Sequence, residues 1–219
     1  AGWIAAAGEL ANNAKQTFVH KILFPEVSFD EDKFLNGVEK DVGDHGYSVI
    51  VASEGLKNKN GELYASSTET DSFGHNQLGG LAPKIASLIT EKLSLKNHWS
   101  VADYLQRSAR HISSQTDIEQ AVAVGKAAVK LAAEGKTGVM PIIKRISDSP
   151  YEWSISEGDL NEIANEEKTL PKHFISSDGF RITKAGRDYL QPLIEGESFP
   201  KFSNGIPIYE GLDLHLRKI

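Results

Sequence analysis

The chain has 219 residues, of which 40% are hydrophobic, and its 24 lysines and arginines against 30 aspartates and glutamates give a formal net charge of −6. A chain of this length is expected to bury about 70% of its unfolded surface, which allows one large domain or two small ones. The acidic balance argues against nucleic acid or an anionic membrane as a partner, and the absence of cysteine excludes disulfides, thiolate nucleophiles and cysteine-based zinc sites.

The opening stretch, AGWIAAAGEL over residues 1–10, is apolar and helix-like, but no Ser, Thr, Asp or Asn precedes it to serve as an N-cap. It has the pattern of a helix that has been cut at its start, and removal of an initiating methionine before a small residue is the alternative. The stretch lacks the basic residues of a signal peptide, and the sequence holds no run of 18 or more apolar residues. We therefore expect a soluble, cytoplasmic protein.

Apolar strands alternate with amphipathic helices from residue 20 to residue 93. Short apolar runs at 20–26 (HKILFPE) and 47–55 (YSVIVASEG) are typical of strands, and the second run has the continuity of a strand covered on both faces. Between them, Ser28 and Glu31 have the spacing of a capping box, which predicts a helix over 29–42 that ends near Gly43. Residues 56–74 are polar and are interpreted as a surface insertion, and a second helix is predicted over 80–93.

The pattern continues as far as Pro150. Residues 98–104 (HWSVADY) and 137–146 (TGVMPIIKRI) are predicted to form strands. Between them lies the clearest helix, over 116–134, with Thr116 and Glu119 as a second capping box and Gly135 at its C-terminal end. Beyond Pro150 the sequence predicts only short helices near 157–165 and 184–191.

Alternating strands and helices of this kind predict an α/β sandwich with a largely parallel sheet, built from strands over 20–25, 48–53, 98–103 and 138–144. We expect residues 1–150 to form this α/β region and residues 151–219 to add short helices and a tail packed on it. In such sheets, ligands bind at the carboxyl ends of the strands.

Two polar groups follow predicted strands directly. Glu54 follows the strand over 48–53, and Tyr104, Gln106 and Arg107 follow the strand over 98–103. If the two strands share a sheet, a carboxylate that accepts bonds from sugar hydroxyls and a guanidinium that binds phosphate face one crevice. Spacing alone leaves open that Glu54 is a solvated loop residue and that Arg107 caps a helix.

Other motifs give weaker signals. The triplet GKT at 135–137 resembles the end of a phosphate-binding loop, but Lys130 stands where that loop needs glycine, so we interpret the triplet as a helix C-cap. His75, His98 and His111 lack the spacing of metal ligands on one element and are interpreted as structural or surface residues. The loop GHNQLGG at 74–80 is left unassigned.

Four segments, taken in order, resemble the second half of a bacterial 6-phosphofructokinase of the pyrophosphate-dependent group: AGWIAAAGELA, VIVASEG, VADYLQRSARHISSQTD and EQAVAVGKAAVKLAAEGKTGVM. The resemblance covers most of residues 1–146, and the segment around YLQR is the most specific part of it. It implies a Rossmann-like three-layer sandwich, incomplete at its N-terminal end. It also implies that Glu54 contacts the sugar of fructose 6-phosphate and that Tyr104 and Arg107 hold its 6-phosphate. Leu105 and Gln106 are expected to belong to the same substrate site.

The same resemblance implies what this chain lacks. The family's motifs for the phosphoryl donor, for magnesium and for the catalytic base precede its counterpart of AGW, and none of them occurs in these 219 residues. The sequence therefore predicts the substrate-binding part of a glycolytic phosphotransferase, with no catalytic or metal-binding residue of its own. Mg²⁺ and pyrophosphate are expected to bind through the absent part, and the intact enzyme is expected to be a homo-oligomer.

Three points stay open on the sequence. His98 stands where ATP-dependent relatives often have an arginine that reaches a neighbouring subunit's phosphate, so that contact is in doubt. Arg110 and His111 lie beside the predicted phosphate-binding residues without an assigned contact. An ATP-dependent phosphofructokinase fragment, or a non-catalytic module that binds sugar phosphates, is the alternative function.

Overall fold

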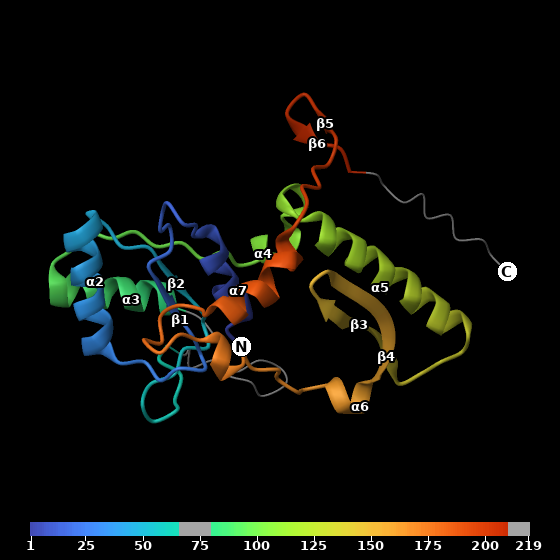
Figure 1. Ribbon diagram of the computed structural model, residues 1–219, viewed down its shortest axis with the longest axis horizontal. Coiled ribbons are helices and arrows are strands. Elements are labelled where there is room, and N and C mark those ends of the chain that lie inside the picture. Colours follow the sequence, from blue (N-terminus) through green and yellow to red (C-terminus); the bar gives the residue numbers. More distant parts are fainter. Residues whose placement is uncertain (66–79, 210–219) are drawn as a thin grey trace.

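A computed structural model describes residues 1–65 and 80–209 (Figure 1). The α-helices are α1 (Trp3–Ala7), α2 (Glu31–His45), α3 (Leu81–Leu93), α4 (Leu105–Ser108), α5 (Gln115–Ala133), α6 (Leu160–Ile163) and α7 (Lys184–Leu190). The strands are β1 (Lys21–Leu23), β2 (Ile50–Ala52), β3 (Val139–Asp148), β4 (Tyr151–Asp159), β5 (Phe202–Ser203) and β6 (Ile206–Pro207). Four short 3-10 helices complete the set: η1 (Gly8–Ala11), η2 (Arg110–Ile112), η3 (Lys172–Phe174) and η4 (Gln191–Ile194).

The centre of the fold is the parallel pair β1–β2, in which Ile22 lies opposite Val51. Successive side chains of a strand point to opposite faces, so Leu23 packs on one side of the pair and Ile22 on the other. Helices cover both faces, and the result is three layers. This confirms the predicted α/β class and explains why the strand runs are apolar without alternation.

Two hydrophobic clusters fill the space between these layers. The first lies under α2 and α3, and Phe34 and Leu81 are its most deeply buried helical residues. The second lies under α1 and α7 and includes Phe24 and Leu190. Because β1 contributes to both clusters, this strand holds the two outer layers together.

The predicted helices form with small shifts at their ends. Helix α2 begins after Asp30, whose carboxylate accepts a hydrogen bond from the Lys33 amide at 3.1 Å, so the expected cap at Ser28 is wrong by two residues. The helix ends at His45, where Gly46 takes a φ of 81° that favours glycine, rather than near Gly43. Helices α3, α6 and α7 lie within the ranges predicted for them.

Helix α5 is capped by Ser114, not by Thr116. The Ser114 hydroxyl accepts from the Asp117 amide at 3.1 Å and donates to the Leu193 carbonyl at 2.8 Å, so one side chain caps the helix and fixes the C-terminal segment. Gly135 follows the helix with a φ of 73°, which confirms that the GKT triplet ends a helix.

The hairpin β3–β4 departs from the predicted topology. The strand predicted over 138–144 is formed, but it pairs antiparallel with β4 and does not join the β1–β2 sheet. Strand β4 lies where only short helices were expected. Figure 1 shows α5 alongside this hairpin and away from β1 and β2, and the Gln120 amide donates to the Tyr151 hydroxyl at 2.7 Å between them.

The strand predicted over 98–103 is absent, and this prediction is wrong. The segment is extended but pairs with no strand in the described part of the chain. Its apolar residues Trp99 and Val101 are 56% and 49% exposed. A β-strand requires backbone hydrogen bonds to a neighbouring strand. An apolar run in the sequence does not by itself provide that neighbour.

The division into residues 1–150 and 151–219 stays a proposal. Its boundary falls in the turn of the β3–β4 hairpin. Across it, the Arg145 guanidinium lies between the rings of Tyr151 and Tyr189, 4.5 Å and 3.9 Å from their centres. The hairpin and α7 thus meet around one cation.

His20 makes the fold sensitive to acid. The buried imidazole accepts a hydrogen bond at Nδ1 from the Val49 amide at 3.1 Å, next to the first pair of β1 and β2. Burial lowers the pKa of His20, and nearby His45, Lys21 and Arg181 act in the same direction, whereas Asp41 opposes them.

The folded protein therefore binds a proton at His20 less readily than the unfolded chain does. We expect full stability from this site above pH about 6.5 and a progressive loss as the pH falls below it. The melting temperature, measured between pH 5 and pH 8, tests this expectation. His20→Asn keeps an acceptor near the Nδ1 position, and its melting temperature should fall less steeply than that of wild type below pH about 6.5. The exposed His111→Asn is the control, and an equally reduced slope in both variants would contradict the prediction.

Candidate functional site

The predicted phosphate-binding residues lie at the surface around α4. Asp103, with a φ of 45°, turns the extended segment into this helix, and Tyr104 is its N-cap residue. Tyr104 is 70% exposed, and the Arg107 guanidinium lies 6.0 Å from the centre of its ring. No hydrogen bond or ion pair occupies the Arg107 side chain within residues 1–65 and 80–209, so its donors are available to an anion.

Leu105 and Gln106 occupy the first two positions of α4. Leu105 is 63% exposed, and Gln106 is exposed as well. The Gln106 amide donates to the Asp103 carbonyl at 3.3 Å, so the backbone of the segment is fixed while its side chains face outward. All four residues of the YLQR segment therefore share one exposed turn.

Glu54 follows β2 directly, as predicted, and one of its oxygens is held by a helix. Its Oε2 accepts a hydrogen bond from the Leu81 amide at 3.3 Å, at the first residue of α3. The positive end of the helix dipole stabilises a carboxylate in this position. The second oxygen accepts no bond in the described part of the chain, which leaves it free for a ligand hydroxyl.

The structure brings Tyr104 and Arg107 together but does not join either to Glu54. No hydrogen bond or ion pair links Glu54 to the YLQR segment among the residues that the structure describes. The prediction of one shared crevice depended on a strand over 98–103 beside β2, and that strand is not formed. A common crevice for Glu54 and Arg107 therefore stays a prediction.

Arg110 has a structural role. Its guanidinium donates to the carbonyl of Ser198 and, at 3.2 Å, to the Ser198 hydroxyl. This contact ties η2 to the C-terminal segment that also pairs with Ser114 through a bridge at Glu197. Among the three basic residues of this stretch, Arg107 and His111 remain exposed, and Arg107 carries the permanent charge.

The other sequence candidates are placed as follows. His98 and His111 are exposed, and His75 and residues 74–79 of the GHNQLGG loop lie outside the described residues. No group of three or more His, Asp or Glu side chains in the described part of the chain is arranged to hold a metal ion. No helix there is long and apolar enough to cross a membrane.

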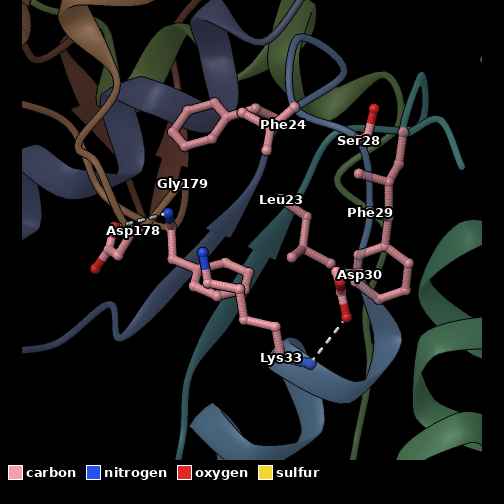
Figure 2. Close-up of a pocket in the computed structure, with 11 residues that line it drawn as sticks. Leu23, Phe24, Ser28, Phe29, Asp30, Lys33, Asp178 and Gly179 are labelled. Carbon is pink, nitrogen blue, oxygen red and sulfur yellow. Dashed lines mark hydrogen bonds between the residues drawn. The ribbon is translucent and has the colours of Figure 1, made fainter. Parts of the chain in front are cut away.

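A cavity of about 230 Å³ opens at the carboxyl end of β1, where α/β folds bind ligands (Figure 2). Its charged groups are Asp30, Lys33 and Asp178, and its apolar lining includes Leu23 and Phe29. Burial raises the pKa of Asp178, but hydrogen bonds from Ser176 and Phe180 outweigh this effect and hold the pKa below its usual value. Two carboxylates against one ammonium do not suit a phosphate.

Sequence reasoning missed a buried charge cluster on the other side of β1. Glu9 is almost fully buried, and Arg181 binds both of its carboxylate oxygens, with Nε at 2.7 and 2.8 Å. These hydrogen bonds raise the pKa of Arg181. The partners are 172 residues apart in sequence, so no local pattern could have paired them.

Comparisons with known proteins agree with one another. The chain is 55% identical over 209 residues to a pyrophosphate–fructose 6-phosphate 1-phosphotransferase of Methylococcus capsulatus and 51% identical over 215 residues to that of Halomonas elongata. These matches cover 95% and 98% of this chain but 50% and 51% of the relatives, so the chain spans about half of their length. No family model matches.

Two solved structures share the fold. The pyrophosphate-dependent phosphofructokinase of Nitrosospira multiformis superposes with a TM-score of 0.80 at 49% identity, over 96% of this chain and 49% of that one. That of Marinobacter aquaeolei gives 0.79 at 48% identity, over 99% of this chain and 52% of the other. In sequence and in fold, this chain corresponds to the C-terminal half of the pyrophosphate-dependent phosphofructokinases.

Proposed function

We propose that this chain is the substrate-binding part of an enzyme that transfers a phosphoryl group from pyrophosphate to the 1-hydroxyl of fructose 6-phosphate, a step of glycolysis. The observation that carries the proposal is its 55% identity, over 95% of its length, with a relative of that name. The products are fructose 1,6-bisphosphate and phosphate. A P–O bond of pyrophosphate breaks, a bond from the sugar oxygen to phosphorus forms, and the hydroxyl proton passes to the released phosphate or to solvent.

The proposed binding roles come from the sequence resemblance, and the contacts of each residue are compatible with them. The Arg107 guanidinium lies over the Tyr104 ring and makes no hydrogen bond or ion pair among the described residues, and Tyr104, which is 70% exposed, adds a hydroxyl donor on the same turn. Together they suit the 6-phosphate, with Leu105 and Gln106 shaping the turn between them. Glu54 keeps one oxygen on α3 and offers the other to a sugar hydroxyl.

Pyrophosphate is the donor that the relatives' names favour over ATP. Phosphoryl transfer depends on positioning and on neutralisation of the donor's charge, which magnesium supplies in many such enzymes. No group of three or more His, Asp or Glu side chains among the described residues is arranged to hold a metal ion, and no step is assigned to the metal. Three further points remain predictions: that magnesium binds through the N-terminal half, that the enzyme is cytoplasmic, and that it is a homo-oligomer.

The proposal predicts weak binding without catalysis for the 219-residue chain. Binding should persist because Tyr104, Arg107 and Glu54 are present, and turnover should be undetectable because no residue described here can hold the phosphoryl donor in line with the 1-hydroxyl. A coupled assay for fructose 1,6-bisphosphate, with pyrophosphate and magnesium, measures this on a chain of verified mass. Sustained turnover would show that catalytic groups lie within these residues.

A further inference from the structure

A polar cavity of about 390 Å³ lies beside the Glu9–Arg181 pair and shares no lining residue with the pocket of Figure 2. Its lining residues are Glu9, Asn12, Asn13, Ala14, Thr17, Arg181 and Arg187. The volume falls within the range of small-molecule sites, about 300 to 1,000 Å³. None of these residues belongs to the predicted substrate site.

The two arginines are fixed through the same glutamate. Arg181 donates hydrogen bonds from Nε and Nη2 to the Glu9 carboxylate, and Arg187 donates from Nη2 to the Glu9 backbone carbonyl at 2.7 Å. The Glu9 side chain is 4% exposed, so it is anchored, while the Arg181 side chain remains 35% exposed. Both guanidinium groups are therefore held in place before any ligand arrives, which lowers the entropy cost of binding.

Each guanidinium keeps donors that are not used within the described chain. Nη1 of Arg181 and Nε and Nη1 of Arg187 make no hydrogen bond to residues 1–65 or 80–209. The Thr17 hydroxyl and the side-chain nitrogen Nδ2 of Asn13, which also line the cavity, make none there either. The rim of the cavity thus offers donors from two elements and few acceptors.

The charges of the cavity favour an anion. The Glu9 carboxylate neutralises the charge of Arg181, so the cavity keeps one net positive charge, that of Arg187. Asp41 and Asp178 act on Arg181 as well, but neither lines the cavity. Asn12 cannot contribute an acceptor because its oxygen already accepts from the Phe18 and Val19 amides, each at 2.7 Å.

We propose that this cavity binds a phosphate group through Arg181 and Arg187, with Thr17 and Asn13 as further donors. Paired guanidinium forks match the oxygens of a phosphate, and a single ammonium would not fix its orientation. The phosphate is either inorganic (phosphate or pyrophosphate) or part of a sugar phosphate. Binding here does not depend on the proposed function, because it uses none of the residues of that site.

The test measures binding of phosphate, pyrophosphate and fructose 6-phosphate by titration calorimetry in an Arg107→Ala background, which removes the predicted substrate phosphate contact. We expect at least one of the three to bind. Adding Arg187→Gln should weaken that ligand about tenfold or more. Lys184→Gln is the matched control, since it removes one positive charge from the same helix outside the cavity, and it should change affinity less than about twofold.

Thr17→Val is a second variant that leaves the buried pair intact, and it should weaken the same ligand by about threefold. The ligand that binds most tightly identifies the source of the phosphate. The proposal is overturned if none of the three ligands binds in the Arg107→Ala background. It is also overturned if Lys184→Gln weakens binding as much as Arg187→Gln does. A third contradicting result is that Thr17→Val and Arg187→Gln both fold and both bind the ligand as well as their parent protein.

Discussion

Replacing Arg107 by alanine is expected to weaken binding of fructose 6-phosphate to this chain by about tenfold to a hundredfold. Charge-assisted hydrogen bonds contribute roughly 1.5 to 3 kcal/mol each, and tenfold in affinity is about 1.4 kcal/mol. The stability of the fold should not change, because the Arg107 side chain forms no described bond or ion pair and lies on an exposed turn.

Titration calorimetry of wild type and Arg107→Ala measures this effect. Lys126→Ala is the control: Lys126 lies exposed on α5, so the change removes the same charge from the chain without altering α4. Its affinity should stay within about twofold of wild type. Equal affinity for all three proteins would remove Arg107 from the substrate site.

Replacing Phe34 by alanine is expected to lower the free energy of unfolding by about 3 to 5 kcal/mol. Phe34 has no exposed surface and packs its ring 5.3 Å from that of Phe29 in the cluster beneath α2 and α3. The loss combines the transfer energy of the ring with the cavity that it leaves, because neighbouring helices cannot close the gap fully.

Urea unfolding followed by circular dichroism measures the change. Val129→Ala, at a position 71% exposed on α5, is the matched truncation and should change stability by less than about 0.5 kcal/mol. A loss below about 1 kcal/mol for Phe34→Ala would contradict the packing described for this cluster.

The elements that could be predicted from the sequence are those with local causes. Helices α2, α3 and α5 follow from apolar periodicity and from nearby capping residues, although Asp30 and Ser114 replace the expected caps. The parallel pair β1–β2 follows from two apolar runs separated by a helix. In each case the contacts that determine the element join residues that are close in sequence or separated by a single helix.

The elements that could not be predicted depend on distant partners. The apolar run over 98–103 has strand composition but finds no strand to pair with among the described residues, and β3 pairs with a segment in which no strand was expected. The role of Arg110 depends on Ser198, 88 residues away. Capping patterns and apolar periods carry no information about such contacts.

The same distinction applies to the candidate site. Glu54, Tyr104 and Arg107 could be named from a resemblance in sequence, and the structure places Glu54 against α3 and the other two on one exposed turn. Their relation to each other could not be predicted, because it rested on a strand that does not form. The Arg181–Glu9–Arg187 cluster carried no sequence signal at all, since it joins Glu9 of η1 to Arg181 and to Arg187 of α7.

Titration calorimetry of the 219-residue chain with fructose 6-phosphate and with fructose measures most directly whether this chain holds a sugar by its phosphate. Fructose lacks the 6-phosphate, which is the group that Tyr104 and Arg107 are proposed to bind. We predict measurable binding of fructose 6-phosphate, loss of most of that affinity in Arg107→Ala, and at least tenfold weaker binding of fructose. Equal binding of the two sugars, or no binding of fructose 6-phosphate by a folded chain, would contradict the proposed substrate site.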